Sequence, residues 1–185
     1  MLLVNQIKWF LIRKKLNKIK FIFLDVDGVM TNGDLLYSEK GDIVKAFNVR
    51  DGLGIKLLKD FGIEIVLISG GSKGSTESRA NDLSIRYCYT AVKDKIKIIE
   101  DLKNTLGFTK SQIIFLGDDI NDLVVKKKVG LLITTKDASN LLKKQSNAIL
   151  NACGGKGAVR ELAERILKGK KGWKDIKRDG WKDTN

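Results

Sequence analysis

The sequence contains no histidine. This absence excludes histidine nucleophiles, Ser-His-Asp triads and zinc sites with histidine ligands. Only two cysteines are present, Cys88 and Cys153, and their wide separation matches no metal-binding spacing. A metal ion in this protein would therefore be held by oxygen atoms, which favours a hard ion such as magnesium.

Long apolar runs and proline are also absent. No run approaches the roughly 20 apolar residues that a membrane-spanning helix needs, so we expect no transmembrane segment. The first residues carry most of their charge after the apolar stretch, and no small-residue cleavage site follows, which is unlike a secretory signal. A reduced, cytoplasmic chain is the simplest interpretation of these features. The lack of proline fits a compact domain but identifies no fold.

Acidic residues are missing from the N-terminus, because residues 1–20 carry six Lys or Arg and no Asp or Glu. Residues 168–185 carry seven Lys or Arg and three acids, so only +3 of the formal net charge of +13 remains for residues 21–167. Basic ends bind acidic partners weakly and without specificity. The nearly balanced middle therefore argues against a protein that binds a specific nucleic acid.

The chain has 185 residues, a length that suits one domain. We predict a basic N-terminal extension over residues 1–19, a domain over residues 20–168 and a basic C-terminal tail over residues 169–185. Apolar residues recur in the extension at roughly helical spacing, which indicates an amphipathic helix. Such a helix could pack on the domain, on a neighbouring subunit or loosely on an acidic surface.

Between the two ends, continuous apolar runs of strand length alternate with helical patterns. Solid apolar runs are typical of parallel strands that are buried on both faces. The pattern predicts an α/β fold with a doubly wound parallel sheet and one inserted β-hairpin. The expected strands are 20–26, 63–71, 87–92, 113–119, 131–135 and 147–150, the hairpin is 33–49, and the expected helices are 50–62, 75–85, 93–107, 120–130, 137–145 and 157–169.

Reactive or polar groups follow several of these strands. Asp25 and Asp27 end the first strand, Ser69 and Gly70 the second, and Asp118 and Asp119 the fourth; Lys95 begins the helix after the third strand. Each group alone could be a turn residue, a helix cap or a solvated side chain. Because ligands bind beyond the carboxyl ends of parallel strands, their joint occurrence predicts a single site.

The chemistry expected of this site is phosphoryl transfer. Clustered carboxylates would repel one another unless a cation such as Mg²⁺ lay between them. Asp25 would attack the phosphorus and form an aspartyl-phosphate, while Asp27 would protonate the leaving alkoxide and later activate water. Lys95 and the Ser69 hydroxyl would bind the phosphate oxygens.

These motifs resemble those of the haloacid dehalogenase (HAD) superfamily of phosphatases, as Asp25-Val26-Asp27-Gly28, Ser69, Lys95 and Gly117-Asp118-Asp119-Ile120-Asn121-Asp122. The resemblance implies that Asp25 is the nucleophile. It also implies that the carboxylates of Asp25 and Asp118 and the main-chain carbonyl of Asp27 bind magnesium. Asp119 and Asp122 would hold these ligands in position without binding the metal themselves.

Most members of this superfamily carry a cap domain, but only a hairpin fits between Gly28 and Arg50. The segments DVDGVMTNG, FNVRDGLGIKLL and GGKGAVREL closely resemble the capless 3-deoxy-D-manno-octulosonate 8-phosphate (KDO 8-P) phosphatase group, and the match covers residues 20–168. The resemblance implies a HAD-like Rossmannoid fold, a role in lipopolysaccharide biosynthesis and a homotetramer built through the hairpin. Neighbouring subunits and a C-terminal segment would close the site.

One position departs from the group, which usually has Thr-Gly-Arg where this chain has Ser69-Gly70-Gly71. Without that arginine, the candidates for binding a substrate carboxylate are Arg50, Arg79 and Arg160. The most favoured substrate is KDO 8-P. A phosphatase for a nine-carbon sugar-acid 9-phosphate of the neuraminate or KDN type is the alternative.

A non-enzymatic phosphoaccepting signalling domain is a further alternative. Such a domain has its phosphoaccepting aspartate after the third strand, whereas Asp25 follows the first and Asp27 supplies an acid that signalling domains lack. A P-loop at residues 70–76 is rejected, because the stretch lacks the G-x-x-x-x-G-K-[ST] spacing.

Overall fold

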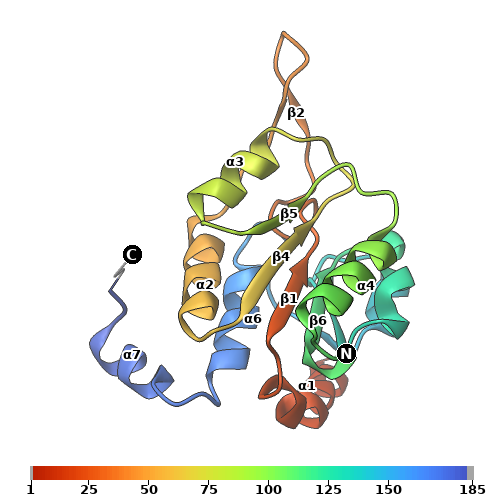
Figure 1. The fold of residues 1–185 in the computed structure, drawn as a ribbon. Helices are drawn as coiled ribbons and strands as arrows, with labels where there is room; N and C mark the ends of the chain where they lie inside the picture. Colours follow the sequence, from red (N-terminus) through yellow and green to blue (C-terminus); the bar gives the residue numbers. More distant parts are fainter. Residues whose placement is uncertain (1, 183–185) are drawn as a thin grey trace.

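Six parallel strands form the central sheet of the computed structural model, which describes residues 2–182 (Figure 1). Their order across the sheet is β5-β4-β1-β6-β7-β8. The strands are β1 (Phe21–Leu24), β4 (Glu64–Ile68), β5 (Tyr87–Tyr89), β6 (Ile113–Gly117), β7 (Leu131–Thr134) and β8 (Ala148–Ile149). The chain builds outward from β1 in one direction and then returns to build in the other. The predicted doubly wound α/β fold is therefore confirmed.

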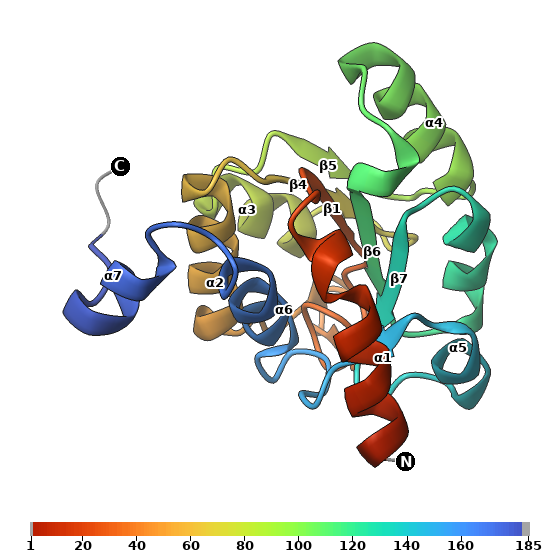
Figure 2. The ribbon, with the colours of Figure 1, turned by 90° about the horizontal axis from the view of Figure 1, so that it is seen from below.

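Helices cover both faces of this sheet (Figures 1 and 2). Successive side chains of a strand point to opposite faces, so Ile22 and Leu24 contribute to one buried cluster and Phe23 to the other. The first cluster packs against α1 (Leu2–Leu16), α2 (Val49–Asp60), α3 (Ser75–Asp82) and α6 (Ala158–Leu167). The second packs against α4 (Lys95–Leu106), the 3₁₀ helix η2 (Ile120–Lys127) and α5 (Asn140–Gln145).

The segment after β6 differs in detail from the expected α-helix, because η2 is a 3₁₀ helix. The backbone N–H of Asp122 donates to the carbonyl oxygen of Asp119 at 3.0 Å, a bond between residues three apart. This tight first turn carries the Asp122 side chain back toward the end of β6. The short helix η1 (Lys110–Gln112) precedes β6.

The only insertion between β1 and α2 is the hairpin of β2 (Leu36–Tyr37) and β3 (Ile43–Val44), which projects from one end of the described chain (Figure 1). The two strands are antiparallel, with Leu36 opposite Val44. Residues 2–182 thus contain the predicted hairpin and no cap domain.

Both predicted terminal segments contain a helix. Helix α1 packs on the sheet edge, where the Trp9 indole N–H donates to the carbonyl of Ile149 at 2.9 Å. Helix α7 (Trp173–Asp179) was not expected from the sequence; Trp173 is buried, and the Trp181 indole N–H donates to Asp60 at 2.7 Å. Residues 1 and 183–185 of these segments lie outside the described residues. No helix among residues 2–182 combines the length and the apolar character needed to cross a membrane.

Candidate active site

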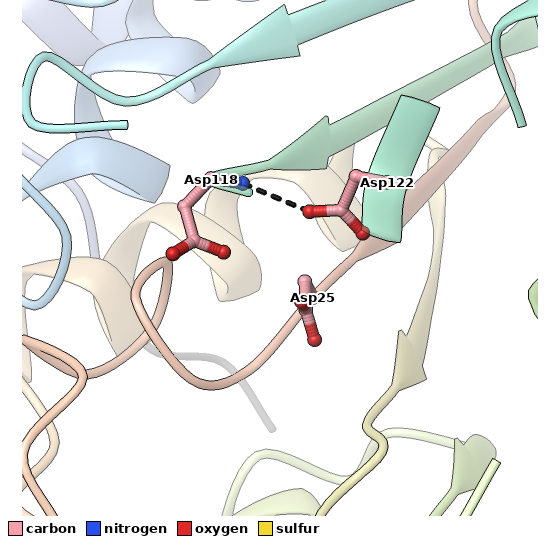
Figure 3. A group of neighbouring side chains, drawn as sticks. All are labelled: Asp25, Asp118 and Asp122. Carbon is pink, nitrogen blue, oxygen red and sulfur yellow. Dashed lines mark hydrogen bonds between the residues drawn. The ribbon is translucent and has the colours of Figure 1, made fainter. Parts of the chain in front are cut away.

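Three aspartates converge at the carboxyl ends of β1 and β6 (Figure 3). Asp25 directly follows β1, Asp118 follows β6, and Asp122 comes from the first turn of η2. One carboxylate oxygen of each lies within 4.8 Å of one from the other two. Because β1 pairs directly with β6, with Leu24 opposite Leu116, the sheet register brings Asp25 level with Gly117, one residue before Asp118.

Gly28 allows the loop after β1 to pass close to Asp118. Its φ angle is 81°, a left-handed conformation that L side chains rarely adopt. A Cβ atom at this position would lie only 2.0 Å from Oδ2 of Asp118. A glycine is therefore required here by both backbone conformation and space.

Lys95 joins two of the three carboxylates from the first turn of α4. Its Nζ atom lies 2.9 Å from Oδ2 of Asp25 and 2.6 Å from Oδ1 of Asp122, and its side chain is buried. Burial alone would lower the pKa of Lys95, but the neighbouring Asp25 and Asp122 carboxylates outweigh burial and raise it. Lys95 is therefore a permanent positive charge at the base of the site.

One lysine does not neutralise three carboxylates. Burial, with the nearby Asp122 carboxylate, raises the pKa of Asp25 to about 6 despite the opposing effect of Lys95. Burial and then the Asp25, Asp122 and Asp119 carboxylates raise the pKa of Asp118 to about 7. The cluster thus holds an excess of negative charge that a divalent cation would offset, and an all-oxygen donor set fits magnesium.

The three carboxylates are not equally free to bind a ligand. Asp122 is fully buried, and its Oδ2 accepts the backbone N–H of Asp118 at 2.9 Å while its Oδ1 binds Lys95. Asp119 is exposed and caps η2 by accepting the N–H of Ile120. No hydrogen bond or ion pair engages the Asp118 carboxylate within residues 2–182. Asp25 and Asp118 are consequently the carboxylates best placed to bind a cation, with Asp122 positioning them.

Asp27 is paired with a lysine that sequence reasoning missed. Lys45, which follows β3 in the inserted hairpin, places Nζ 2.7 Å from Oδ1 and 2.8 Å from Oδ2 of Asp27. The same ammonium lies 3.4 Å from the Thr76 hydroxyl, and the Lys45 side chain is buried. In the sequence, Lys45 is one of two lysines in the hairpin, with Lys40, so no local signal distinguishes it.

Ser69 lies beside Asp27 at the end of β4. Its hydroxyl is 3.4 Å from Oδ2 of Asp27 and accepts the backbone N–H of Gly71 at 3.0 Å. A Cβ atom at Gly71 would lie 3.0 Å from that Asp27 oxygen and 3.1 Å from Nζ of Lys45. Gly70 forms the turn between these residues, and a Cβ there would approach only the Val92 carbonyl, at 3.7 Å.

A cavity of about 810 Å³ extends from Lys45 between the hairpin and α3. Besides Lys45, its cationic lining residues are Lys73 and Arg79. The Arg79 guanidinium donates to the backbone carbonyl of Asn48 at 3.3 Å. This cavity is large enough for a sugar acid, and its three cationic side chains outnumber its two acidic ones, Asp42 and Asp82.

The other two predicted arginines do not meet the aspartate cluster within this chain. Arg50 is exposed on the first turn of α2. The Nε atom of Arg160 lies 2.7 Å from Glu164 on α6. Of the three candidates, only Arg79 lines the cavity beside Lys45.

Asp51 is a buried acid that sequence reasoning missed. It accepts the backbone N–H groups of Gly157 and Arg160 at 3.2 Å and 2.9 Å, at the start of α6. Burial raises the pKa of Asp51, although these N–H groups act in the opposite direction. Asp51 therefore attaches α2 to the glycine-rich segment before α6.

That segment packs against the loop after β1. The backbone N–H of Gly155 donates to the carbonyl of Val29 at 2.9 Å, and a Cβ at Gly154 would lie 2.0 Å from the carbonyl oxygen of Gly28. Residues 154 and 155 therefore pack on the loop that follows β1 in the same chain.

Comparisons with known proteins agree with this geometry, although no family model matches the chain. The sequence is 38% identical over 155 residues to the KDO 8-P phosphatase of Haemophilus influenzae. These aligned residues cover 84% of this chain and 86% of that protein. A crystal structure of the Moraxella catarrhalis KDO 8-P phosphatase, in complex with a magnesium ion, a phosphate ion and a KDO molecule, gives a TM-score of 0.86 at 34% identity and covers 90% of this chain and 96% of that chain. A HAD superfamily (subfamily III A) hydrolase from Legionella pneumophila gives 0.85 at 34% identity, over 90% and 91% of the two chains.

Proposed function

The chain belongs to the KDO 8-P phosphatase family of the HAD superfamily, and from this membership we propose that it is a magnesium-dependent phosphatase that hydrolyses KDO 8-P. The observation that carries the proposal is the arrangement of Asp25, Asp118 and Lys95 at the carboxyl ends of the strands. Three carboxylates and an ammonium at this edge form a site for a cation and a phosphate together.

In the proposed reaction, Asp25 is the nucleophile. Its carboxylate oxygen attacks phosphorus, the bond to the sugar oxygen breaks, and an aspartyl-phosphate forms on Asp25. Lys95, 2.9 Å from Asp25, places positive charge beside the incoming phosphate. Magnesium bound to Asp25, Asp118 and the main-chain carbonyl of Asp27 would offset phosphate charge and let the carboxylate approach.

Asp27 is the proposed general acid and base. It lies two residues after Asp25 and beside the Ser69 hydroxyl. It would give a proton to the leaving sugar oxygen and later take one from the water that hydrolyses the aspartyl-phosphate. Lys45 holds Asp27 in place through the hairpin. The Ser69 hydroxyl and the backbone N–H of Gly70 bind phosphate oxygens, while the N–H of Gly71 donates to the Ser69 hydroxyl.

For the carboxylate of the substrate, the cavity supports Arg79 over Arg50 and Arg160. Arg79 lines the cavity with Lys45 and Lys73 in the same chain. Arg160 is paired with Glu164, so its contact with substrate would require a neighbouring subunit or a change of partner. Gly71 stands where the KDO 8-P phosphatase group usually has an arginine, so one expected contact with the sugar acid is missing. A nine-carbon sugar-acid 9-phosphate is therefore the second candidate substrate.

We also propose that the hairpin builds a homotetramer of a cytoplasmic enzyme. Its apolar side chains Leu35, Leu36, Tyr37 and Val44 are exposed in the single chain. A two-stranded hairpin of this kind is marginally stable alone and gains stability by packing on a partner. Light scattering of the wild type and of Leu36→Asp would test this assembly, which a fully active wild-type monomer would rule out.

The experiment that tests the function is phosphate release with and without magnesium. The substrates are KDO 8-P, a neuraminate-type 9-phosphate and para-nitrophenyl phosphate, which has no carboxylate. KDO 8-P should give the highest kcat/KM, and Asp25→Asn should abolish turnover without loss of fold. Turnover of the deamidation-free variant at the wild-type rate would remove Asp25 as nucleophile.

The same assay separates the three arginines, which serve as controls for one another. Arg79→Ala should raise KM for KDO 8-P by about tenfold or more and leave that for para-nitrophenyl phosphate nearly unchanged, because only KDO 8-P presents a carboxylate. Arg50→Ala should alter neither constant. A selective rise in Arg160→Ala instead would assign the carboxylate to Arg160.

A further inference from the structure

Helix α1 presents apolar side chains on two opposite faces. One face, with Trp9, Ile12 and Leu16, is buried against the domain. At 3.6 residues per turn, a second set of apolar residues faces the other way. We call this second set the outer stripe of α1; it consists of Leu3, Val4, Ile7, Phe10 and Leu11.

The outer stripe is exposed along its length, with side chains from 51% (Ile7) to 70% (Leu3) accessible. Single exposed apolar residues are ordinary, but a continuous row of five on one helix face is typical of a surface that binds something. The contacts of α1 with the domain do not use this row, since they run through Asn5, Trp9 and the inner face.

Basic residues flank the outer stripe. The guanidinium of Arg13 lies 3.6 Å from the ring centroid of Phe10, and Lys14 and Lys15 follow in the last turn. Residues 1–20 contain six cationic and no acidic side chains. Within residues 2–182, Lys14 and Lys15 form no ion pair.

Two hollows adjoin the C-terminal end of α1, and both are lined by Asn17. The first, of about 310 Å³, includes Arg13, Lys14 and Lys168. The second, of about 440 Å³, is lined by Lys18, Lys20 and Lys170. Among the residues that the structure describes, no acidic side chain lines either hollow. Each hollow therefore has the charge and size to accept an anionic headgroup beside the apolar stripe.

We propose that the outer stripe of α1 and these two hollows dock the enzyme on a membrane surface that contains anionic phospholipid. The apolar side chains would enter the boundary between headgroups and acyl chains, while the lysines and arginines bind lipid phosphates. A helix of 15 residues is about 22 Å long and its inner face is occupied, so it lies along the surface rather than across it.

The charge and apolar character of this surface favour a membrane over two other binding partners, a second copy of the chain and a nucleic acid. A second copy would bring its own basic N-terminus against the first, and the like charges would repel. A nucleic acid would satisfy the lysines but leave five apolar side chains in water. Of these three occupants, only an anionic lipid surface would bind both the apolar row and the positive charge.

The placement of α1 keeps the active site open in the docked state. Helix α1 lies at the end of the sheet opposite the projecting hairpin (Figure 1). Asp25 and Asp118 lie at the carboxyl ends of β1 and β6, on the hairpin side. Docking would therefore hold the enzyme near the membrane without covering the site.

The test is flotation of the full chain with vesicles. Wild-type protein should float with vesicles of equal parts phosphatidylcholine and phosphatidylglycerol, and not with phosphatidylcholine alone. Ile7→Ser/Phe10→Ser should raise the half-saturating lipid concentration by about tenfold or more, because it removes half-exposed apolar area from the stripe. Val124→Ser/Leu141→Ser, which removes exposed apolar residues elsewhere, should bind like the wild type.

A second pair of variants tests the charge. Lys14→Gln/Lys168→Gln should weaken binding, whereas Lys97→Gln/Lys127→Gln, with the same loss of charge elsewhere on the surface, should not. The proposal is overturned if the wild type does not bind anionic vesicles or if the control pairs lose as much binding. It is also overturned if light scattering shows that Ile7→Ser/Phe10→Ser dissociates an oligomer, or if RNA binds the wild type more tightly than the vesicles do. Phosphatase activity enters none of these measurements.

Discussion

Lys45 binds both carboxylate oxygens of Asp27, at 2.7 Å and 2.8 Å, across the join between the inserted hairpin and the domain. The proposed general acid is thus held by a residue of the inserted hairpin and not by one of the central sheet or its covering helices. The position of the hairpin and the chemistry of the site are linked through this one ion pair.

Loss of Lys45 should therefore reduce catalysis without unfolding the chain. We expect Lys45→Met to lower kcat by about tenfold or more, because Asp27 loses the partner that orients it. Lys45→Arg should recover part of the rate, and Lys40→Met, which changes an exposed lysine of the same hairpin, should have no effect. Light scattering would confirm that the assembly is unchanged, and a wild-type kcat in Lys45→Met would contradict the role.

Substitutions of Asp27 and of Asp118 should differ in their effects on magnesium binding and turnover. Asp118→Ala removes a carboxylate that no other group among residues 2–182 engages, so we expect it to lose magnesium binding together with activity. Asp27→Asn keeps its main-chain carbonyl, so it should bind magnesium nearly as the wild type does while turnover falls by about a hundredfold or more. Titration calorimetry with magnesium separates the two; magnesium binding lost in Asp27→Asn but retained in Asp118→Ala would reverse the assignment.

The raised pKa of Asp118 makes the metal-free chain sensitive to pH. The folded chain releases this proton at about pH 7, whereas the usual value is 3.8, so between these values the folded state binds more protons than the unfolded state. The contribution of Asp118 to stability therefore falls as pH rises through this window.

Asp118→Asn removes that contribution. In a metal chelator, its melting temperature should exceed that of the wild type at pH 8, and the difference should shrink as pH falls toward 4. Excess magnesium should reverse the order at pH 8, since only the wild type gains a ligand. An equal difference at all pH values would mean that Asp118 is not the titrating group.

Gly154 should be intolerant of a side chain. A Cβ there would lie 2.0 Å from the carbonyl oxygen of Gly28, so the glycine-rich segment would have to move away from the loop after β1. We expect Gly154→Ala to lower the free energy of unfolding by about 1–3 kcal/mol in urea titrations. Gly70→Ala is the control, because its Cβ would meet nothing closer than 3.7 Å; equal losses in both would contradict the steric reason.

The sheet and the aspartate cluster could be predicted because their signals are local. Each strand is a solid apolar run, and Asp25, Lys95 and Asp118 fall at strand or helix ends, where the rule for parallel sheets brings them together. Lys45 and Asp51 could not be identified, since each looks like a solvated charge until its partner from another part of the chain is placed. Helix α7 was missed because its short polar sequence is stabilised by tertiary contacts of Trp173 and Trp181.

The position of β1 between β4 and β6 has a consequence for synthesis on the ribosome. Both of its neighbours come later in the chain, and β6, which pairs Leu116 with Leu24, is encoded in the second half. Until β6 emerges, the nascent chain exposes one edge of an apolar strand and holds Asp25 without Asp118. In this interval the chain lacks one of the two carboxylates proposed to hold magnesium, and the unpaired edge of β1 is open to pairing with other chains.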